Sequence, residues 1–556
     1  MNTHPRMTLP RAMLAVALAA AVATAPALAH AAEGAQTGAG LASFGGTLEA
    51  QTHREHPLQL AEGDFVQGRL VGKGMRLVLM DRDGKRAKIL AKGRRDDQDF
   101  MFVAGDRGPY ALDVRAPEAG SYQLSVQHRV PRAEQVAPPP AIDSPRLRAL
   151  QQQLAQGGGT DAFWAEAAAQ GGPLIEGGTA GATAGSGPQI SPSLARDELL
   201  LTFLWRGAQR NVRILGAPSS DHDEMQRLGG SDVWYRSYRV PASTRLSYRL
   251  APDVPELNGT AMQRRRAILA TVQRDPLNPR SFPARPLDQY DGASVLELPA
   301  APPQQWVQPR AGVPQGGLEK LRLASKHLGN ERDIYLYRSH GYRPGAKGNA
   351  LVVLFDAENY TTDVPTPAIL DNLVAAGALP PTAAILIANP SGETRSAELP
   401  PNPAFARFLS QELMPWARQR GVHAPAAQTV IAGASYGGLA AAYAGLKHPE
   451  LFGKVYSQSG SFWWAPPQQD AEWLTRQFVD LRAAARRPPL RFLLEAGQFE
   501  TGRNGGAGIV DTTRHLRDVL RAKGYAVAHR EYAAGHDYYH WRGSLANGLI
   551  EMIGKR

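Results

Sequence analysis

The pattern of apolar and polar positions divides this chain into segments of different character. Between about residues 45 and 130, short runs with a period of two are separated by turns rich in Gly, Asp and Pro. These runs fall at residues 65–70, 75–80, 88–91, 110–115 and 121–126. Several short strands at this spacing are typical of a β-sandwich, so the pattern predicts a small β-sandwich domain over residues 45–132.

A second set of alternating runs begins after a segment without such alternation. Residues 133–194 are rich in Pro at their start, helical in composition in the middle and rich in Gly, Ala and Thr towards their end. This composition favours a helical and Gly-rich linker. Strand-like runs then return and predict a second sandwich over residues 195–255. The proline-punctuated residues 256–315 are expected to form an irregular connector.

The remaining residues, 316–556, have a different pattern, in which apolar runs alternate with helical stretches. This alternation is typical of a mostly parallel sheet covered by helices on both faces. The predicted fold class is therefore α/β, with a mostly parallel sheet preceded by two small β-sandwich domains. Strands are predicted at 332–337, 350–355, 383–387, 429–432, 454–458, 490–495 and 526–532, and helices at 368–376, 404–419, 438–446, 512–523 and 544–553.

The first residues have the three-part order of a secretory signal peptide. Arg6 and Arg11 precede an apolar run at 12–29, and small residues at the end of this run offer a cleavage site. A transmembrane anchor is the alternative, but the run is short, rich in Ala and interrupted by a proline. We therefore predict a cleaved signal peptide at residues 1–32.

The composition narrows the chemistry that the chain can perform. Its 556 residues include no Cys, which excludes disulfide bonds, thiolate metal sites and a cysteine nucleophile. The formal net charge of +11 is spread along the sequence without a polybasic block, and nucleic acid is therefore not an expected partner. An anionic small molecule or an anionic membrane surface would suit this charge better.

One segment carries a catalytic pattern. Residues 430–441 read VIAGASYGGLAA, so that an apolar strand leads into G-x-S-x-G and then into a helix of small residues. In this pattern the glycines allow a sharp turn that exposes the Oγ of Ser435 at the carboxyl end of its strand. The arrangement is that of the nucleophile in α/β-hydrolases, which transfer acyl groups. The alternative is a tight strand-to-helix turn with a serine that has no catalytic role.

A nucleophilic serine needs a base and an acid, which α/β-hydrolases supply in the chain order Ser, acid, His. His536 lies just after the last predicted strand, where that histidine is expected. Glu500 lies on the loop after the preceding strand and is the favoured acid. The alternatives for the acid are Glu495, Asp511 and Asp537.

An oxyanion hole requires two backbone N–H groups aimed at the developing alkoxide. One is expected from Tyr436, because it directly follows the nucleophile. The other is expected from the loop after the predicted strand at 350–355, where Glu358 is the favoured donor.

Longer motifs carry a family resemblance. They are MQRLGGSDVW at 225–234, DPL at 275–277, RSAEL at 395–399, AGASYGGLAAAYAGL at 432–446, FGKVYSQSGSFWW at 452–464, LEAGQFE at 494–500 and GHDYYHWRG at 535–543. SQSGSFWW combined with GHD-x-x-x-WR is much more specific than G-x-S-x-G. With these motifs, the chain from about residue 195 to the C-terminus resembles the enterochelin (enterobactin) esterases.

The resemblance implies an immunoglobulin-like domain followed by an α/β-hydrolase domain. Ser435 and His536 match the family's nucleophile and base, and Glu500 lies at its acid position, although some members work with a Ser/His pair. The family hydrolyses the trilactone of enterobactin-type catecholate siderophores, either free or as the ferric complex. Cationic and aromatic side chains would hold such a substrate. The candidates for this role are Arg395, Trp463, Trp464, Trp541 and Arg542.

The resemblance implies no cofactor and no metal site, since iron would arrive inside the substrate. Together with the signal peptide it implies a periplasmic enzyme, whereas the best-known members of this two-domain form are cytoplasmic. Any contact with siderophore uptake proteins is expected to be transient, and no stable membrane insertion is expected. The N-terminal sandwich is additional to the family pattern and has no role that the resemblance assigns.

Two other functions are compatible with the sequence. A general or feruloyl-type esterase, or an acyltransferase, would share the triad but not the substrate. A siderophore-binding protein with a degenerate hydrolase domain would share the substrate but not the reaction. The complete G-x-S-x-G turn and the late histidine argue against a degenerate domain.

Overall fold

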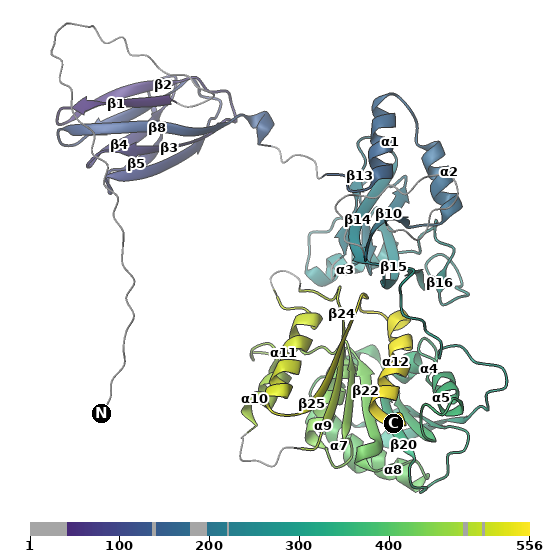
Figure 1. The fold of residues 1–556 in the computed structure, drawn as a ribbon. Coiled ribbons are helices and arrows are strands. Elements are labelled where there is room, and N and C mark those ends of the chain that lie inside the picture. Colours follow the sequence, from purple (N-terminus) through teal and green to yellow (C-terminus); the bar gives the residue numbers. More distant parts are fainter. Residues whose placement is uncertain are drawn as a thin grey trace, which may run out of the picture. The chain divides into compact units, whose positions relative to one another are not determined.

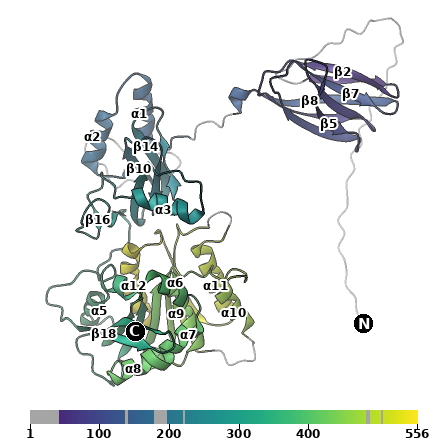
Figure 2. The same cartoon turned by 180° about the vertical axis from the view of Figure 1, so that it is seen from behind.

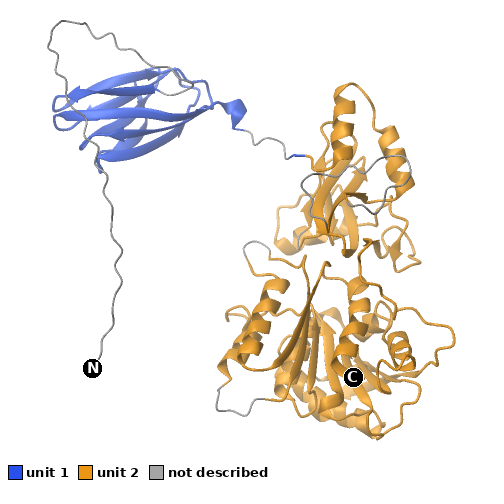
Figure 3. Ribbon diagram, viewed as in Figure 1, with its two compact units in different colours: residues 1–141 blue, residues 142–556 orange. Residues whose placement is uncertain are grey.

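The computed structural model describes residues 42–135, 141–177, 197–219, 222–481, 488–502 and 506–555. The chain divides into two compact units, Met1–Ala141 and Ile142–Arg556 (Figure 3). The predicted signal peptide lies outside the described residues and stays a prediction. Among the described residues, every helix is too short or too polar to cross a bilayer.

The first unit is a β-sandwich of two four-stranded antiparallel sheets, with strand orders β1-β8-β3-β6 and β2-β7-β4-β5 (Figures 1 and 2). Side chains such as Leu70, Val114 and Leu124 fill the space between the sheets. The period-two pattern therefore predicted this fold correctly. The strands are β1 (Ala42–Leu48), β2 (Thr52–Leu58), β3 (Phe65–Val71), β4 (Arg76–Met80), β5 (Arg86–Lys92), β6 (Asp97–Val103), β7 (Tyr110–Ala116) and β8 (Gly120–Val130).

The second unit begins with another sandwich, whose sheets have the orders β13-β14-β10-β9 and β12-β11-β15-β17-β16. Phe203 of one sheet packs edge-on against Tyr248 of the other, at the centre of the core between them. The elements are α1 (Pro145–Ala155), α2 (Asp161–Gln170), β9 (Leu174–Glu176), β10 (Glu198–Arg206), β11 (Val212–Leu215), β12 (Asp223–Glu224), β13 (Gln226–Arg227), β14 (Val233–Pro241), β15 (Arg245–Pro252), α3 (Ala261–Thr271), β16 (Ser281–Phe282) and β17 (Ala293–Glu297).

Helices α1 and α2 cover the outer face of the sheet that contains β10. Leu147 and Trp164 of these helices share a buried apolar cluster with Leu204 of β10. Strand β9 then pairs with β10 at the edge of the same sheet. The prediction of a linker over 133–194 is therefore wrong for this part of the segment, because its apolar side chains are buried against the sandwich.

The predicted connector at 256–315 also contributes to the second sandwich. Strand β17 pairs with β15, and its Leu296 belongs to the core between the sheets. Helix α3 packs on β15 through Ala267 and Ile268. The domain thus extends well beyond residue 255, because strands far apart in the sequence complete its second sheet.

The C-terminal domain of the second unit is built on an eight-stranded sheet with the order β18-β19-β21-β20-β22-β23-β24-β25 (Figure 1). The two pairings that involve β19 are antiparallel and the others are parallel. The sheet confirms the predicted α/β class. Its strands are β18 (Gly317–Ser325), β19 (Asn330–Arg338), β20 (Ala350–Phe355), β21 (Thr382–Ile387), β22 (Thr429–Ala434), β23 (Lys454–Gln458), β24 (Arg491–Gly497) and β25 (Ala526–Tyr532).

Helices cover both faces of this sheet. One apolar cluster joins the sheet to α7–α11, and a second joins it to α4, α5 and α12 on the opposite face. Strands β20 and β22 are buried throughout, which explains their continuous apolar sequences. The helices are α4 (Ala357–Thr361), α5 (Thr366–Ala375), α6 (Gly392–Glu398), α7 (Pro403–Arg407), α8 (Met414–Gln419), α9 (Tyr436–Lys447), α10 (Trp473–Asp480), α11 (Ile509–Ala522) and α12 (Tyr538–Ile553).

Candidate active site

Ser435 lies at the sharp turn between β22 and α9. Its backbone has φ 57° and ψ −121°, a combination that is strained for a residue with a side chain. Backbone hydrogen bonds hold it there, because its N–H donates to the carbonyl of Gln458 at 3.0 Å and its carbonyl accepts from the N–H of Ser461 at 3.1 Å. The turn has the form of a nucleophile elbow, which exposes the serine Oγ beyond the end of the strand.

The glycines of this turn are required by the close approach of strand and helix. A Cβ on Gly433 would lie 2.7 Å from the backbone carbonyl carbon of Gly437. A Cβ on Gly438 would lie 2.4 Å from the Oγ of Ser457 on the neighbouring strand. Since both distances are too short for a side chain, the small residues of the motif allow the elbow to form.

His536 lies on the loop between β25 and α12, and Glu500 lies on the loop after β24. The Nδ1 atom of His536 is 2.5 Å from the Oε1 atom of Glu500. The other carboxylate oxygen of Glu500 accepts a hydrogen bond from the N–H of Gly497 at 2.6 Å. The buried Glu500 side chain is thus fixed at both oxygens, and it orients the more exposed imidazole.

The three alternative acids are engaged elsewhere. Asp511 accepts a hydrogen bond from the N–H of Gly508 and caps α11. Asp537 caps α12 and accepts the backbone N–H of Ser247. Glu495 is buried within the strand, where burial raises its pKa to about 7. The structure therefore brings Glu500 to His536, as the sequence predicted.

Ser435, His536 and Glu500 line one cavity with a volume of about 1050 Å³. Loops of the hydrolase domain form one side of it, with Ser461 and Trp463 close to the nucleophile. The Oγ of Ser435 lies 3.3 Å from the Oγ of Ser461. The second sandwich forms the other side, so that the cavity lies between the two domains of this unit. The sandwich residues in its wall are Leu215, Gly216, Ala217, Ser219, His222, Leu246, Ser247, Tyr248, Arg249, Arg265, Phe282, Pro283, Gly292 and Ala293.

The predicted oxyanion donors lie at the starts of two helices. Tyr436 is the first residue of α9, and Glu358 lies in the first turn of α4, directly after β20. N–H groups in a first helical turn have no acceptor within their own helix. Asn359 and Asp363, which follow Glu358, line the cavity. The assignment of the Tyr436 and Glu358 N–H groups to the oxyanion hole stays a prediction.

Arg395 does not line the cavity and instead holds the loop after β20. Its guanidinium forms two hydrogen bonds with the carboxylate of Asp356, at 2.7 and 2.8 Å. Asp356 has a left-handed backbone (φ 56°) and also accepts the amide of Asn389. The guanidinium lies over the ring of Tyr436, 5.9 Å from its centroid. Arg395 thus braces both segments that carry the predicted oxyanion donors.

Comparison with known proteins agrees with this architecture. Residues 200–307 match the family model "Enterochelin esterase, N-terminal", and residues 325–552 match the model "Putative esterase". The chain is 31% identical over 434 residues to the iron(III) enterobactin esterase of Dickeya dadantii, which covers 71% of this chain and 93% of that protein. The chain belongs to the enterobactin esterase family.

Two solved structures of enterobactin esterases are also similar to this chain. The enterobactin esterase from Shigella flexneri, crystallised in the presence of enterobactin, is 31% identical with a TM-score of 0.52, over 65% of this chain and 94% of that chain. The ferric enterobactin esterase from Salmonella typhimurium is 29% identical with a TM-score of 0.53, over 64% of this chain and 94% of that chain. The N-terminal sandwich lies outside the family models, the first of which begins at residue 200.

The three tryptophans predicted to bind substrate occupy different environments in this esterase. Trp463 is 42% exposed, lines the cavity and lies 6.1 Å from the ring of Tyr436. Trp464 packs edge-on against Trp473 beside the hydrolase core instead. Trp541 is buried, donates its Nε1 hydrogen to the Oγ of Ser459, and packs its ring 4.8 Å from that of His536. Trp463 is therefore the one of the three in the cavity wall, whereas Trp541 supports the base.

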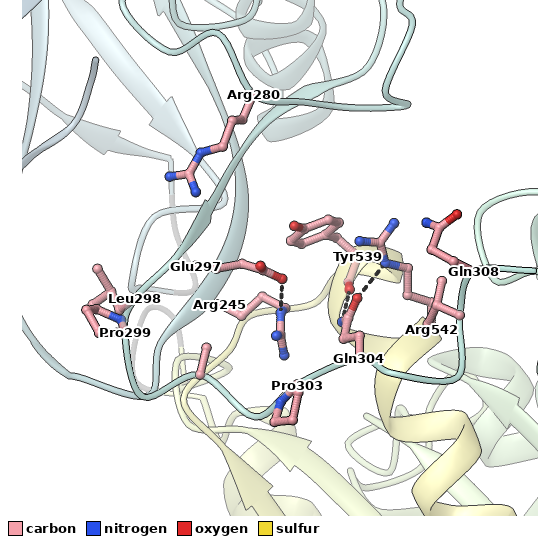
Figure 4. A pocket seen from close by; sticks show the side chains of 12 residues that line it. Arg245, Arg280, Glu297, Leu298, Pro299, Pro303, Gln304, Gln308, Tyr539 and Arg542 are labelled. Carbon is pink, nitrogen blue, oxygen red and sulfur yellow. Dashed lines mark hydrogen bonds and ion pairs between the residues drawn. The ribbon is translucent and has the colours of Figure 1, made fainter. Parts of the chain in front are cut away.

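Arg542 lies in a separate cavity of about 500 Å³ between the sandwich and α12 (Figure 4). Its Nε donates to Gln304 at 2.7 Å. Its guanidinium lies over the rings of Tyr539 and Phe282, at 4.1 and 5.1 Å from their centroids. Arg542 therefore does not line the cavity that holds Ser435, and its predicted role in substrate binding stays a prediction.

Sequence reasoning missed the cavity residues that the second sandwich supplies. Arg249 and Arg265 are its two arginines in the cavity wall. Ser461, which contacts Ser435, was part of the SQSGSFWW motif but was not singled out. A sequence pattern could have placed Ser461 near the carboxyl end of β23. It contained no signal for Arg249 and Arg265, because their position depends on how the two domains pack.

Proposed function

We propose that this esterase hydrolyses the trilactone esters of an enterobactin-type catecholate siderophore and that it works in the periplasm. One observation carries the reaction: Ser435, His536 and Glu500 line a single large cavity, and His536 is hydrogen-bonded to Glu500. The substrate class is supported by the relatives, whose names specify iron(III) enterobactin and one of which was crystallised in the presence of enterobactin.

In the acylation step, the Oγ of Ser435 attacks an ester carbonyl carbon while His536 accepts the hydroxyl proton at Nε2. Glu500 keeps the other proton of the imidazole on Nδ1 and stabilises the imidazolium that forms. The negative charge on the former carbonyl oxygen is stabilised by the N–H groups of Tyr436 and Glu358. The intermediate then collapses, the ester C–O bond breaks, and His536 returns the proton to the leaving serine hydroxyl of the substrate.

In the deacylation step, water replaces the leaving alcohol. His536 removes a proton from the water while the water oxygen attacks the acyl carbon. The proton passes to the Oγ of Ser435 when the acyl-enzyme bond breaks. The products are a free carboxylate and the regenerated serine. Trp463 offers an aromatic face in the cavity wall for a catechol ring of the substrate.

The periplasmic location rests on the order of residues 1–32, which is that of a secretory signal peptide. Expression of the full chain, followed by cell fractionation and mass spectrometry of the N-terminus, tests it. We expect the mature protein in the periplasmic fraction, beginning near residue 30. An uncleaved chain in the cytoplasm would contradict the proposed location without bearing on the reaction.

Chromatography of the products from purified protein and enterobactin tests the reaction. We expect linear and monomeric dihydroxybenzoylserine products from the ferric complex, the iron-free siderophore or both. Hydrolysis of feruloyl esters with no turnover of either form of enterobactin would contradict the proposed substrate. A fluorophosphonate probe tests whether the protein is an enzyme or only binds siderophores. Covalent labelling of the wild type, with none in Ser435→Ala, would exclude a protein that only binds siderophores.

A further inference from the structure

We propose that Arg249 and Arg265 form a cationic subsite through which the second sandwich recognises the negative charge of an iron-loaded catecholate substrate. The proposal rests on the proposed function of the site and deepens it, because it assigns specificity to residues outside the hydrolase domain. It also replaces the role that the sequence suggested for Arg395 and Arg542, which are engaged elsewhere.

Strand β15 places Arg249 in the wall of the cavity that holds Ser435. Side chains alternate between the two faces of a strand, and Leu246, Tyr248 and Leu250 are buried in the sandwich core. Arg249 therefore lies on the opposite face of β15, and it is the charged residue of this strand in the cavity wall. The same strand is attached to the catalytic loop, because the N–H of Ser247 donates to the carboxylate of Asp537. Arg249 is thus held in register with the loop that carries the base.

Arg265 comes from helix α3, whose buried face fixes its direction. Ala267 and Ile268 pack against Ala251 and Val254 of the sandwich. Arg265 is exposed and lines the cavity that holds Ser435. Successive helical residues point about 100° apart, and the cavity lining accordingly includes none of its immediate neighbours on the helix.

No carboxylate of the described residues is paired with the two guanidinium groups. Within the described ranges, neither side chain has a hydrogen bond or ion pair to a carboxylate. Both side chains line the same cavity. Burial lowers the pKa of Arg249, and the positive charge of Arg265 lowers it further.

The carboxylates in the same cavity wall are Asp363, Glu500 and Asp537. Glu500 is paired with His536, Asp537 accepts two backbone N–H groups, and Asp363 accepts the amide of Asn359. None of these groups neutralises the arginine pair. A bound anion would relieve the repulsion between the two cations, and its own desolvation would be offset by their charge.

The charge of a catecholate siderophore depends on its iron. Iron(III) bound by three doubly deprotonated catechols is a trianion, whereas the iron-free compound keeps its phenolic protons near neutral pH, as phenols do. The planar guanidinium can donate two hydrogen bonds to catecholate oxygens or stack on a ring. A pair of arginines without a counter-ion is therefore expected to favour the iron-loaded form over the neutral one.

Steady-state kinetics of charge-removing variants test this subsite. Arg249→Gln and Arg265→Gln are compared with Arg266→Gln, a neighbour on α3 that does not line the cavity. Each of the first two should raise the KM for ferric enterobactin roughly tenfold, since a hydrogen bond to a charged group is lost. The kcat and KM for p-nitrophenyl acetate should stay within about twofold, and Arg266→Gln should resemble the wild type with every substrate.

A binding measurement makes the result independent of catalysis. In the Ser435→Ala background, the quenching of Trp fluorescence by ferric enterobactin reports the dissociation constant directly. Arg249→Gln should weaken this binding and reduce its dependence on salt, and Arg249→Lys should lose less, because it keeps the charge but not the planar fork. Equal losses on all substrates, or the same effect from Arg266→Gln, would overturn the proposal.

The outcome separates the subsite from the reaction. If the wild-type protein hydrolyses neither form of enterobactin, the proposed function fails. If it hydrolyses them and the arginine variants keep its selectivity for the ferric form, the reaction stands and the cationic subsite is refuted.

Discussion

The carboxylate of Asp537 lies 2.6 Å from the backbone nitrogen of Ser247, and this hydrogen bond joins the loop of the catalytic base to the second sandwich. A second bond, from the N–H of Arg245 to the carbonyl of Ala533 at 3.0 Å, fixes the other end of the same loop. His536 lies between these two attachments. The sandwich therefore positions the base as well as closing the cavity, so that catalysis and substrate recognition depend on the same domain contact.

Ser435→Ala should remove several orders of magnitude from kcat with a neutral ester, because only binding and oxyanion stabilisation remain. Loss of a triad serine costs on the order of 10⁶-fold in a well-characterised protease. Folding should be unaffected, since the side chain is small and the elbow is held by its backbone. Circular dichroism and thermal melting provide the control, and a variant with more than about a tenth of wild-type turnover would rule out Ser435 as the nucleophile.

Glu500→Gln should cost less than the loss of the serine, roughly 10²- to 10⁴-fold in kcat, because the acid orients the imidazole and makes no bond to substrate. Asp537→Asn is the matched control. The two carboxylate oxygens of Asp537 each accept one N–H group, so the amide keeps only one of these two bonds. Because the acid that is hydrogen-bonded to His536 is Glu500, kcat should still fall by less than in Glu500→Gln. A large loss of kcat in Asp537→Asn with none in Glu500→Gln would show that Asp537, and not Glu500, is the acid of the triad.

The residues that sequence analysis placed correctly are those whose position follows from their own strand. Ser435 and Glu500 each follow a buried strand of the parallel sheet, and His536 follows the last strand, at the edge where such strands all end. Continuous apolar runs such as β20 mark these strands in the sequence. Knowing the fold class was therefore enough to bring the three side chains together.

The features that sequence analysis missed depend on contacts between distant segments. Strand β2 is largely exposed and has a polar sequence, so it gave no period-two signal. The helix that carries Trp164 is flanked by Gly, and this composition predicts part of a linker, although its apolar face covers a sheet whose strands come later in the chain. The sequence contains no signal that distinguishes Arg542 from Arg249. Only the packing of the two domains places Arg542 in the separate cavity beside α12 and Arg249 in the cavity that holds Ser435.

Arg395→Ala should reduce kcat by a similar factor, about 10- to 100-fold, for ferric enterobactin and for p-nitrophenyl acetate. The substitution leaves the buried carboxylate of Asp356 without its cation and loosens the loop that carries the predicted oxyanion donor. The kcat of Arg395→Lys should lie between those of the wild type and Arg395→Ala, since lysine keeps the charge but cannot form the paired hydrogen bonds. A rise in KM for the ferric complex alone, with kcat unchanged, would instead make Arg395 a substrate-binding residue.

Glu495 should make the stability of the hydrolase domain depend on pH. Burial raises its pKa from 4.5 to about 7, so between these two values the folded protein binds more protons than the unfolded chain. The free energy of unfolding should therefore fall as the pH rises through this window. The difference corresponds to at most about 3 kcal/mol at pH 8. Glu495→Gln removes the titration and should be more stable than the wild type at pH 8, with little difference near pH 4.5.

Urea unfolding followed by Trp fluorescence measures this effect, because all nine Trp residues lie in the second unit. The buried His540, whose pKa burial lowers to about 3, acts in the opposite direction, since the unfolded chain binds its proton more tightly. That contribution is common to both proteins and cancels in the difference between the variant and the wild type. If Glu495→Gln changed stability equally at pH 5 and pH 8, the carboxylate of Glu495 would be ionised across the whole range, and its burial would not control its charge.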